Sequence, residues 1–180
     1  MRVYLSGAHG SGKSTLARYI SKQHKLPILT EVARKILSER ELKIDNIRHD
    51  LDLVDEYQQE VLNRQIAEEK KQSSFVSDRS AIDALGYIAQ HTRLLHTNIR
   101  SAELTTYVAG LKQPDVKVFF VRPTKATLKS DGVRETIVWD GVVAIDAIIK
   151  CLLELFAIPY IPIATESMQE RVRLIDAVLS

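Results

Sequence analysis

Residues 7–14 constrain the fold of this chain more than any other segment, because they read G-A-H-G-S-G-K-S, a complete Walker A pattern. The pattern follows an apolar run at residues 3–5 and precedes a helix-like stretch at residues 14–20. This strand–loop–helix context is the one in which the pattern binds phosphate. The glycines let the backbone curl so that successive N–H groups point at phosphate oxygens, and the following helix N-terminus adds a partial positive charge.

Two side chains of the loop have specific roles in this chemistry. Lys13 supplies a positive charge near the β- and γ-phosphates, and the Ser14 hydroxyl is a ligand for Mg²⁺. His9 is expected to contribute through its backbone. The sequence therefore predicts ATP and Mg²⁺ as cofactors, with a nucleotide site formed by Gly7, Ala8, His9, Gly10, Ser11, Gly12, Lys13, Ser14 and Thr15.

Length and composition place further bounds on the chain. Its 180 residues predict one domain, 1–180, and a net charge of +2 gives no reason to require nucleic acid or an anionic membrane as partner. No apolar run approaches the length of a membrane span. The single cysteine, Cys151, excludes an intrachain disulfide and is expected to be buried on a helix face. We expect a cytoplasmic protein, as a monomer or a homodimer.

Strand-like and helix-like segments alternate along the chain, which favours a parallel sheet covered by helices on both faces. Two polar stretches, 41–49 and 92–100, are predicted loops. Ser80 and Asp83, like Ser167 and Glu170, have the spacing of a capping box at a helix start. The predicted strands are 2–6, 27–29, 74–77, 116–121 and 158–163, and the predicted helices are 13–24, 30–40, 50–72, 80–91, 99–112, 140–156 and 167–179.

Polar residues that directly follow the predicted strands are expected to meet, because ligands of open α/β sheets bind beyond the carboxyl ends of the strands. Asp78 ends the third strand and can hold Mg²⁺, and Arg79 can neutralise phosphate charge or orient a carboxylate. Glu31 follows the second strand, where it can accept a proton from an attacking hydroxyl or bind a sugar hydroxyl. Arg34 lies one helical turn later. A surface ion pair between Glu31 and Arg34 is the alternative interpretation.

The basic segment after the fourth strand, 122–135, is interpreted as a short lid over the phosphates. Arg122 begins it and is predicted to help bind nucleotide, and Arg134 lies near its end, after an Asp-Gly turn signal. Arg64 on the third predicted helix is a candidate for binding the acceptor, although a solvated helix face explains it equally well.

These motifs, taken in order, resemble the small P-loop kinases. The nearest pattern is that of the ribosylnicotinamide-kinase-like group, with deoxynucleoside and thymidylate kinases as wider relatives, and the similarity spans nearly the whole chain. The resemblance implies a three-layer α/β P-loop NTPase fold with a five-stranded parallel sheet and helices on both faces. It also implies that Glu31 binds substrate or acts as base, that Arg79 handles phosphate, that Arg134 is a lid arginine, and that Ala164 and Thr165 lie near adenine.

The predicted function is therefore ATP-dependent phosphoryl transfer to a small acceptor, a nucleoside or a nucleotide. A kinase acting on a nucleic-acid hydroxyl and a regulatory ATP-binding module without catalysis both stay open. Hydrolysis as the main purpose is disfavoured, because the chain has no Asn-Lys-x-Asp tetrapeptide and because Arg79, not a glutamate, follows Asp78.

Overall fold

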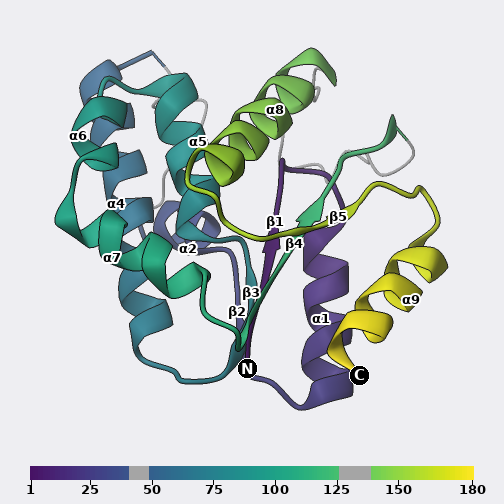
Figure 1. Ribbon diagram of the computed structural model, residues 1–180. Helices are drawn as coiled ribbons and strands as arrows, with labels where there is room; N and C mark the ends of the chain where they lie inside the picture. The colour runs from purple at the N-terminus through teal and green to yellow at the C-terminus, as the bar shows by residue number, and fades with distance from the viewer. Residues whose placement is uncertain (41–48, 126–138) are drawn as a thin grey trace.

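The computed structural model describes residues 1–40, 49–125 and 139–180 and places five parallel strands in one sheet (Figure 1). The strand order is β2-β3-β1-β4-β5, so the first strand lies at the centre. Arg134, the predicted lid arginine, lies outside the described residues. The sheet confirms the α/β fold with five parallel strands.

The strands and helices alternate along most of the chain. The strands are β1 (Arg2–Ser6), β2 (Ile28–Leu29), β3 (Phe75–Asp78), β4 (Val116–Val121) and β5 (Ile161–Ile163). The helices are α1 (Lys13–His24), α2 (Val32–Glu39), α4 (Leu51–Lys70), α5 (Ala81–His91), α6 (Leu95–Ile99), α7 (Ala102–Leu111), α8 (Trp139–Leu155) and α9 (Met168–Leu179).

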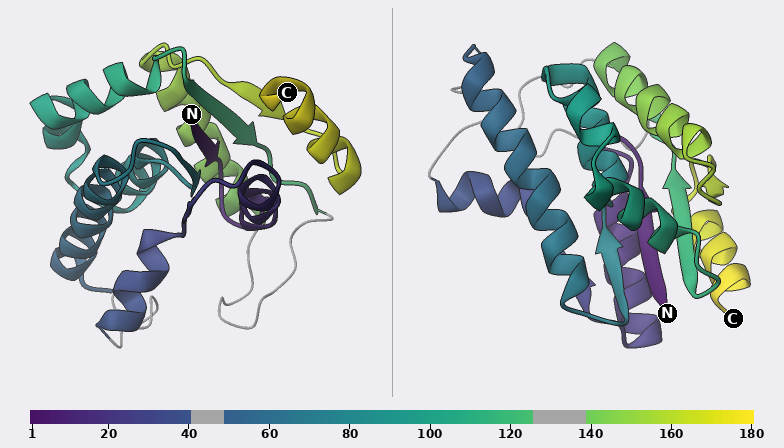
Figure 2. Two further views of the ribbon diagram at one scale, coloured as in Figure 1. Left: turned by 90° about the horizontal axis from the view of Figure 1, so that it is seen from below. Right: turned by 60° about the vertical axis from the view of Figure 1, so that its left-hand side comes forward.

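Helices cover both faces of the sheet (Figure 2). Successive side chains of each strand point to opposite faces, so each face presents apolar side chains to the helices that cover it. On β1, Val3 and Leu5 pack with Leu16 of α1 and Ile175 of α9. Tyr4 faces the opposite side, where it joins a larger core that α2, α4, α5, α7 and α8 complete. Two apolar cores, one on each side of the sheet, therefore hold the carboxyl ends of the strands in a fixed arrangement.

The pairing registers of the strands place the predicted functional segments at the same end of the sheet, beyond the carboxyl ends of the strands. Leu5 of β1 is level with Asp78 of β3, and Ser6 is level with Phe120 of β4. The loop after β1 and the residues after β3 and β4 therefore begin side by side, as the rule for open α/β sheets requires.

Three local features differ from the sequence-based expectations. Residues 95–99 form the short helix α6, within a stretch predicted as loop. The terminal strand covers only Ile161–Ile163, shorter than the predicted 158–163. Cys151 is exposed on α8, so the expectation of a buried thiol was wrong. Its apolar neighbours Leu152 and Leu153 take the inward-facing positions of the helix instead.

Candidate nucleotide and acceptor site

The loop between β1 and α1 has a backbone that depends on glycine. Gly7 has φ 137°, and a Cβ added there would lie 2.4 Å from the carbonyl oxygen of Val121. Gly12 has φ 91° and occupies the N-cap of α1. A glycine at the N-cap cannot cover the first N–H groups of the helix with a side chain, so these donors face outward. They form the kind of anion site that the Walker pattern predicts.

Asp83 of α5 holds the start of this loop through a hydrogen bond. The side chain is fully buried, and its Oδ1 accepts a hydrogen bond of 2.6 Å from the backbone N–H of Gly7. Its Oδ2 accepts from the N–H and the hydroxyl of Ser80, both at 2.7 Å, which completes the predicted capping box. Sequence reasoning found the cap but missed the contact with Gly7. A charge-assisted bond of this kind fixes the entry to the loop.

Lys13 is buried within the loop that it serves. Its Nζ donates to the carbonyl oxygen of Ala8 at 2.5 Å and to Oγ of Ser11 at 3.1 Å. Burial, and to a lesser degree the nearby Arg79 guanidinium, lowers the pKa of Lys13 to about 8. The cation therefore lies in a poorly solvated position, where an added anion such as a phosphate stabilises the charged form.

Ser14 and Asp78 meet across the loop. The Ser14 hydroxyl donates to Oδ2 of Asp78 at 2.5 Å, and Asp78 is buried at the end of β3. Both residues were predicted from sequence as metal ligands. These two neighbouring oxygens are donors of the type that a cation such as Mg²⁺ prefers. Among the residues that the structure describes, no group of three or more His, Cys, Asp and Glu side chains gathers to hold a metal by itself.

Glu31 links two arginines beside the loop. Its Oε1 accepts from Nε of Arg79 at 2.9 Å, and its Oε2 accepts from Nε of Arg34 at 2.8 Å. Arg79 and Glu31 are largely buried, whereas the Arg34 side chain is 55% exposed. Burial acts to lower the pKa of the Arg79 guanidinium, but Glu31 together with the nearby Tyr87, Asp83 and Asp78 outweighs burial and raises that pKa. The predicted pair between Glu31 and Arg34 is present, and Arg79 extends it to a triad in which Glu31 and Arg79 are largely buried and Arg34 is exposed.

Arg79 adopts an unusual backbone conformation, with φ 98°. A non-glycine residue rarely occupies this region, and doing so costs about 1–3 kcal/mol. The side chain compensates through several contacts: it pairs with Glu31, approaches the Gly7 carbonyl oxygen at 3.5 Å and lies over the ring of Tyr87 at 5.3 Å. The strained backbone thus directs the guanidinium toward the phosphate-binding loop.

These residues line one pocket of about 790 Å³. The loop forms one wall, and the segments after β2 and β3 form the other. Of the sequence-predicted site residues, the following lie in its lining: His9, Gly10, Ser11, Gly12, Lys13, Ser14, Thr15, Glu31, Arg34, Asp78 and Arg79. Arg18, Thr30, Lys35, Ser38 and Glu39 complete it. Gly7 and Ala8, at the start of the loop, are not part of this lining.

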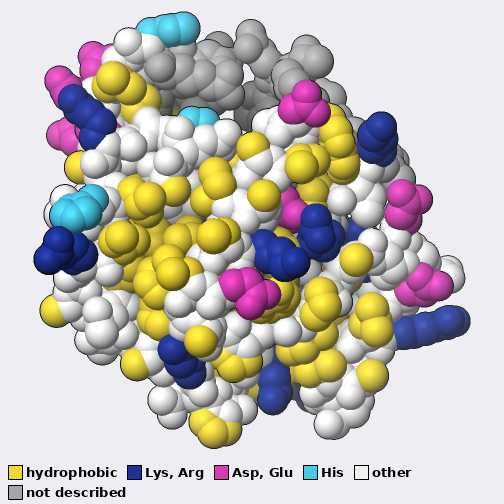
Figure 3. All heavy atoms as spheres, turned by 45° about the horizontal axis from the view of Figure 1, so that its top comes forward, with side chains coloured by type: hydrophobic (Ala, Val, Ile, Leu, Met, Phe, Trp, Pro, Cys, Tyr) yellow, Lys and Arg dark blue, Asp and Glu magenta, His cyan; other side chains and the backbone are white. Residues whose placement is uncertain are grey.

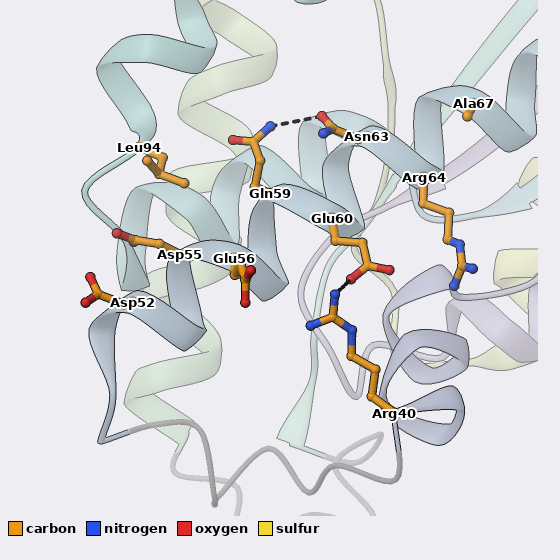
Figure 4. A pocket seen from close by; sticks show the side chains of 10 residues that line it. All are labelled: Arg40, Asp52, Asp55, Glu56, Gln59, Glu60, Asn63, Arg64, Ala67 and Leu94. Carbon is orange, nitrogen blue, oxygen red and sulfur yellow. Dashed lines mark hydrogen bonds and ion pairs between the residues drawn. The ribbon is translucent and has the colours of Figure 1, made fainter.

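Arg64 does not line this pocket. Its Nη1 donates to Oε2 of Glu39 at 2.5 Å, and the residue lines a second hollow of about 700 Å³ between the end of α2, α4 and the segment before α6 (Figure 4). Arg40 pairs with Glu60 at its rim (Figure 4). Arg64 therefore lies outside the pocket that contains the Walker loop and Glu31, and its role toward an acceptor stays a prediction.

Arg122 and the 164–165 segment lie on the other side of the loop. Arg122 forms an ion pair of 2.6 Å with the buried Asp146 of α8, whose pKa is raised by burial. The carbonyl oxygens of Arg122 and Thr165 both accept hydrogen bonds from Arg171 of α9. These predicted nucleotide residues therefore adjoin the Walker loop without lining the pocket beside Glu31.

Two side chains near the loop escaped sequence analysis. Arg171 is fully buried and reaches the Ser11 carbonyl oxygen, although only a Ser-x-x-Glu-Arg pattern marked its position. The imidazole Nδ1 of His9 lies 2.9 Å from the Tyr87 hydroxyl, so the side chain of His9, and not only its backbone, forms a contact near the loop.

None of the helices in the described ranges combines the length and apolar character that a transmembrane helix needs.

The five-stranded parallel sheet, the glycine-dependent loop after β1 and the buried Lys13 define a P-loop fold. The sequence profile described as an AAA domain matches residues 2–171, and the chain belongs to this family. No curated protein sequence matches the chain.

Solved structures share this fold at low sequence identity. NadR in complex with NR has a TM-score of 0.74 and 17% identity over 98% of this chain, which spans only 50% of the NadR chain. Deoxyadenosine kinase from M. mycoides with dCMP has a TM-score of 0.69 and 18% identity, covering 99% of this chain and 98% of the other. Shikimate kinase from Aquifex aeolicus has a TM-score of 0.58 and 15% identity, covering 99% and 96%.

Proposed function

We propose that the protein is an ATP- and Mg²⁺-dependent kinase that phosphorylates a nucleoside- or nucleotide-type small molecule. The observation that carries this proposal is that the Walker loop and the Glu31–Arg79 pair face the same pocket. A protein that only binds nucleotide would need the Walker loop but not the Glu31–Arg79 pair. A second charged wall opposite the phosphates gives an acceptor a place to bind within reach of the transferred group.

The chain's own residues fit a magnesium nucleotide. The N–H groups after Gly7 and at the start of α1 would hold phosphate oxygens, and Ser14 with Asp78 would hold the cation. Mg²⁺ usually takes one or two protein oxygens and completes its shell with phosphates and water, so two ligands are sufficient. The bound cation would draw charge from the phosphates during transfer.

The opposite wall would orient the acceptor. Glu31 is held by guanidinium groups on both of its oxygens, and a carboxylate oxygen has a further lone pair with which it can accept a hydrogen bond from a substrate hydroxyl. It would align that hydroxyl and take its proton as the new bond from the hydroxyl oxygen to the γ-phosphorus forms and the bond from the γ-phosphorus to the bridging oxygen breaks, so that ADP leaves. Lys13 and Arg79 both line the pocket, so they would stabilise the charge of the transferring phosphoryl group.

Surface charge supports a small acceptor rather than a long polynucleotide. Among the described residues on the face shown in Figure 3, basic and acidic side chains are interspersed and form no extended basic area. The net charge of +2 is also small for a chain that would bind many phosphates. NadR and deoxyadenosine kinase carry NR and dCMP in their structures, which makes nucleosides and nucleotides the first compounds to test. We further propose the cytoplasm as its compartment.

The deciding experiment measures ADP release from ATP and Mg²⁺ with a panel of nucleosides, nucleotides and oligonucleotides. We expect release that depends on a nucleoside-type acceptor. Arg34→Ala should raise the KM for this acceptor, whereas Arg100→Ala, at the exposed C-cap of α6 and outside both hollows, should leave turnover unchanged. ATP binding without acceptor-dependent ADP release would contradict the kinase proposal and favour a regulatory module. Release only with oligonucleotides would contradict the small-molecule acceptor.

A further inference from the structure

Arg171, in the first turn of α9, is the largest fully buried side chain among the residues that the structure describes. A buried guanidinium is normally matched by a carboxylate, because an unpaired charge in the interior is costly. Within residues 1–40, 49–125 and 139–180, Arg171 forms no ion pair with an acidic side chain. Its placement therefore needs another explanation.

Three backbone carbonyl oxygens accept the hydrogen bonds of this guanidinium, and the nearby Glu166 carboxylate acts on its charge without forming an ion pair. Nε of Arg171 donates to Thr165 at 2.7 Å, Nη1 donates to Ser11 at 2.5 Å, and Nη2 donates to Arg122 at 3.3 Å. These acceptors belong to the β5–α9 segment, the Walker loop and the end of β4. One planar group thus joins three segments that the sequence separates widely, the contact with Ser11 spanning 160 positions.

The same turn of α9 packs directly under the loop. A Cβ added at Gly12 would lie 3.4 Å from Cε of Met168 and 3.5 Å from Nη1 of Arg171. The Thr165 hydroxyl in turn donates to Glu170 of α9. The loop, the first turn of α9 and the 164–165 segment are therefore one connected unit. Burial lowers the pKa of the Arg171 guanidinium, but an arginine stays charged at neutral pH.

We propose that Arg171 is a positioning residue for nucleotide binding, which holds the Walker loop against the 164–165 segment and places a positive charge beneath the phosphates. This inference rests on the proposed nucleotide site but not on the identity of the acceptor. The preformed loop has less conformational freedom to lose when nucleotide binds, so the contact increases affinity. The buried charge also acts on the phosphates through a medium of low polarity.

The test measures the Kd of ATP by calorimetry without any acceptor. Arg171→Met keeps an unbranched apolar stem but removes all donors, and it should weaken ATP binding about tenfold to a hundredfold. Arg171→Lys keeps the charge but cannot reach three carbonyls at once, so its Kd should lie between those of the wild type and Arg171→Met. In kinetic assays the KM for ATP should rise while the KM for the acceptor stays constant.

Tyr19→Phe is the matched control. The Tyr19 hydroxyl also attaches α9 to α1, through bonds of 3.0 and 2.9 Å to the two oxygens of Asp176, but it lies away from the loop. This variant should lose some thermal stability and keep its Kd for ATP within about twofold. If Arg171 only docked α9, the Arg171 variants would show the same pattern. An unchanged Kd for ATP in a folded Arg171→Met or Arg171→Lys protein would overturn the proposal.

A measurement on the unaltered protein guards against variants that fail to fold. ATP should slow amide hydrogen exchange at 164–171 as well as at 7–15, because Arg171 connects the two segments. Protection confined to 7–15 would overturn the proposal. If the wild type binds no ATP at all, the proposed kinase function also fails. If it binds ATP but phosphorylates no acceptor, only the kinase function fails.

Discussion

Replacing Lys13 with methionine should stabilise the folded chain while it removes phosphoryl transfer. Methionine retains the length and most of the volume of the lysine stem but carries no charge. Lys13 is 4% exposed, and burial is the main reason why its pKa falls from 10.5 to about 8. The buried ammonium group therefore lowers the free energy of unfolding, and replacing it with an uncharged side chain removes this destabilisation.

The size of the effect follows from these values. A pKa that falls from 10.5 to about 8 corresponds to about 3 kcal/mol of unfavourable free energy at neutral pH. The substitution also removes hydrogen bonds to Ala8 and Ser11, each of which contributes about 1 kcal/mol. The variant should therefore be more stable than the wild type by about 1 kcal/mol near pH 7, yet slower in phosphoryl transfer by about a hundredfold or more.

The pH dependence provides the decisive measurement. Between pH 8 and 10.5 the unfolded wild-type chain binds more protons at Lys13 than the folded chain does, so its free energy of unfolding gains from this group as pH rises. Lys13→Met lacks this gain. Its stability relative to the wild type should fall by about 2 kcal/mol between about pH 7 and about pH 9.5. Denaturant unfolding at several pH values measures the difference.

Lys35→Met is the control, because Lys35 lines the same pocket but is exposed. Its stability relative to the wild type should not vary with pH in this range. A Lys13→Met variant whose relative stability is equally constant would refute the argument from burial. Near-normal turnover by the folded Lys13→Met protein would refute the assigned role of the lysine in phosphoryl transfer.

Three further substitutions test other parts of the site. Asp78→Asn should weaken Mg²⁺-dependent turnover more than metal-free nucleotide binding, and an unchanged Mg²⁺ titration would show that Asp78 only begins a helix. Glu31→Gln should lower kcat by about 10²–10⁴-fold and leave the Kd of ATP nearly intact if the acceptor is a neutral hydroxyl. If the acceptor is a phosphate, its KM should rise instead, and no change in either parameter would place the acceptor elsewhere. Burial raises the pKa of Glu69 from 4.5 to about 7, so the stability that this protonated carboxyl contributes below about pH 4.5 is lost as pH rises through about 7. Glu69→Gln should reduce that loss in melting experiments between pH 5 and 8, and an identical pH profile in variant and wild type would contradict the raised pKa.

The sequence predicted those parts of the site that depend on local order. The Walker loop needs only neighbouring residues and a strand–loop–helix context, and the capping box at Ser80 and Asp83 is likewise a local pattern. Glu31, Asp78 and Arg79 then come together at the carboxyl ends of the strands, because parallel strands end on the same side of the sheet. Their meeting in one pocket follows from the topology, and alternation of strands and helices was sufficient to predict it.

The remaining features depend on contacts between distant segments. The bond from Gly7 to Asp83 spans 76 positions, and no sequence pattern marks the second role of that carboxylate. Arg64 has the right residue type for an acceptor site, but periodicity alone does not say which face of α4 it occupies. The helix α6 was missed because a helix of five residues is too short for a periodic apolar pattern.

The central place of β1 in the sheet has a consequence for synthesis on the ribosome. Arg2 pairs with Phe75 on one side and with Val116 on the other, so β1 can form both of its pairings only after two later strands have been made. At about 5–20 residues per second, the segment between β1 and β4 takes about 5–20 s to be made. The segment that forms the phosphate-binding loop is therefore made well before the strands and helices that complete its scaffold.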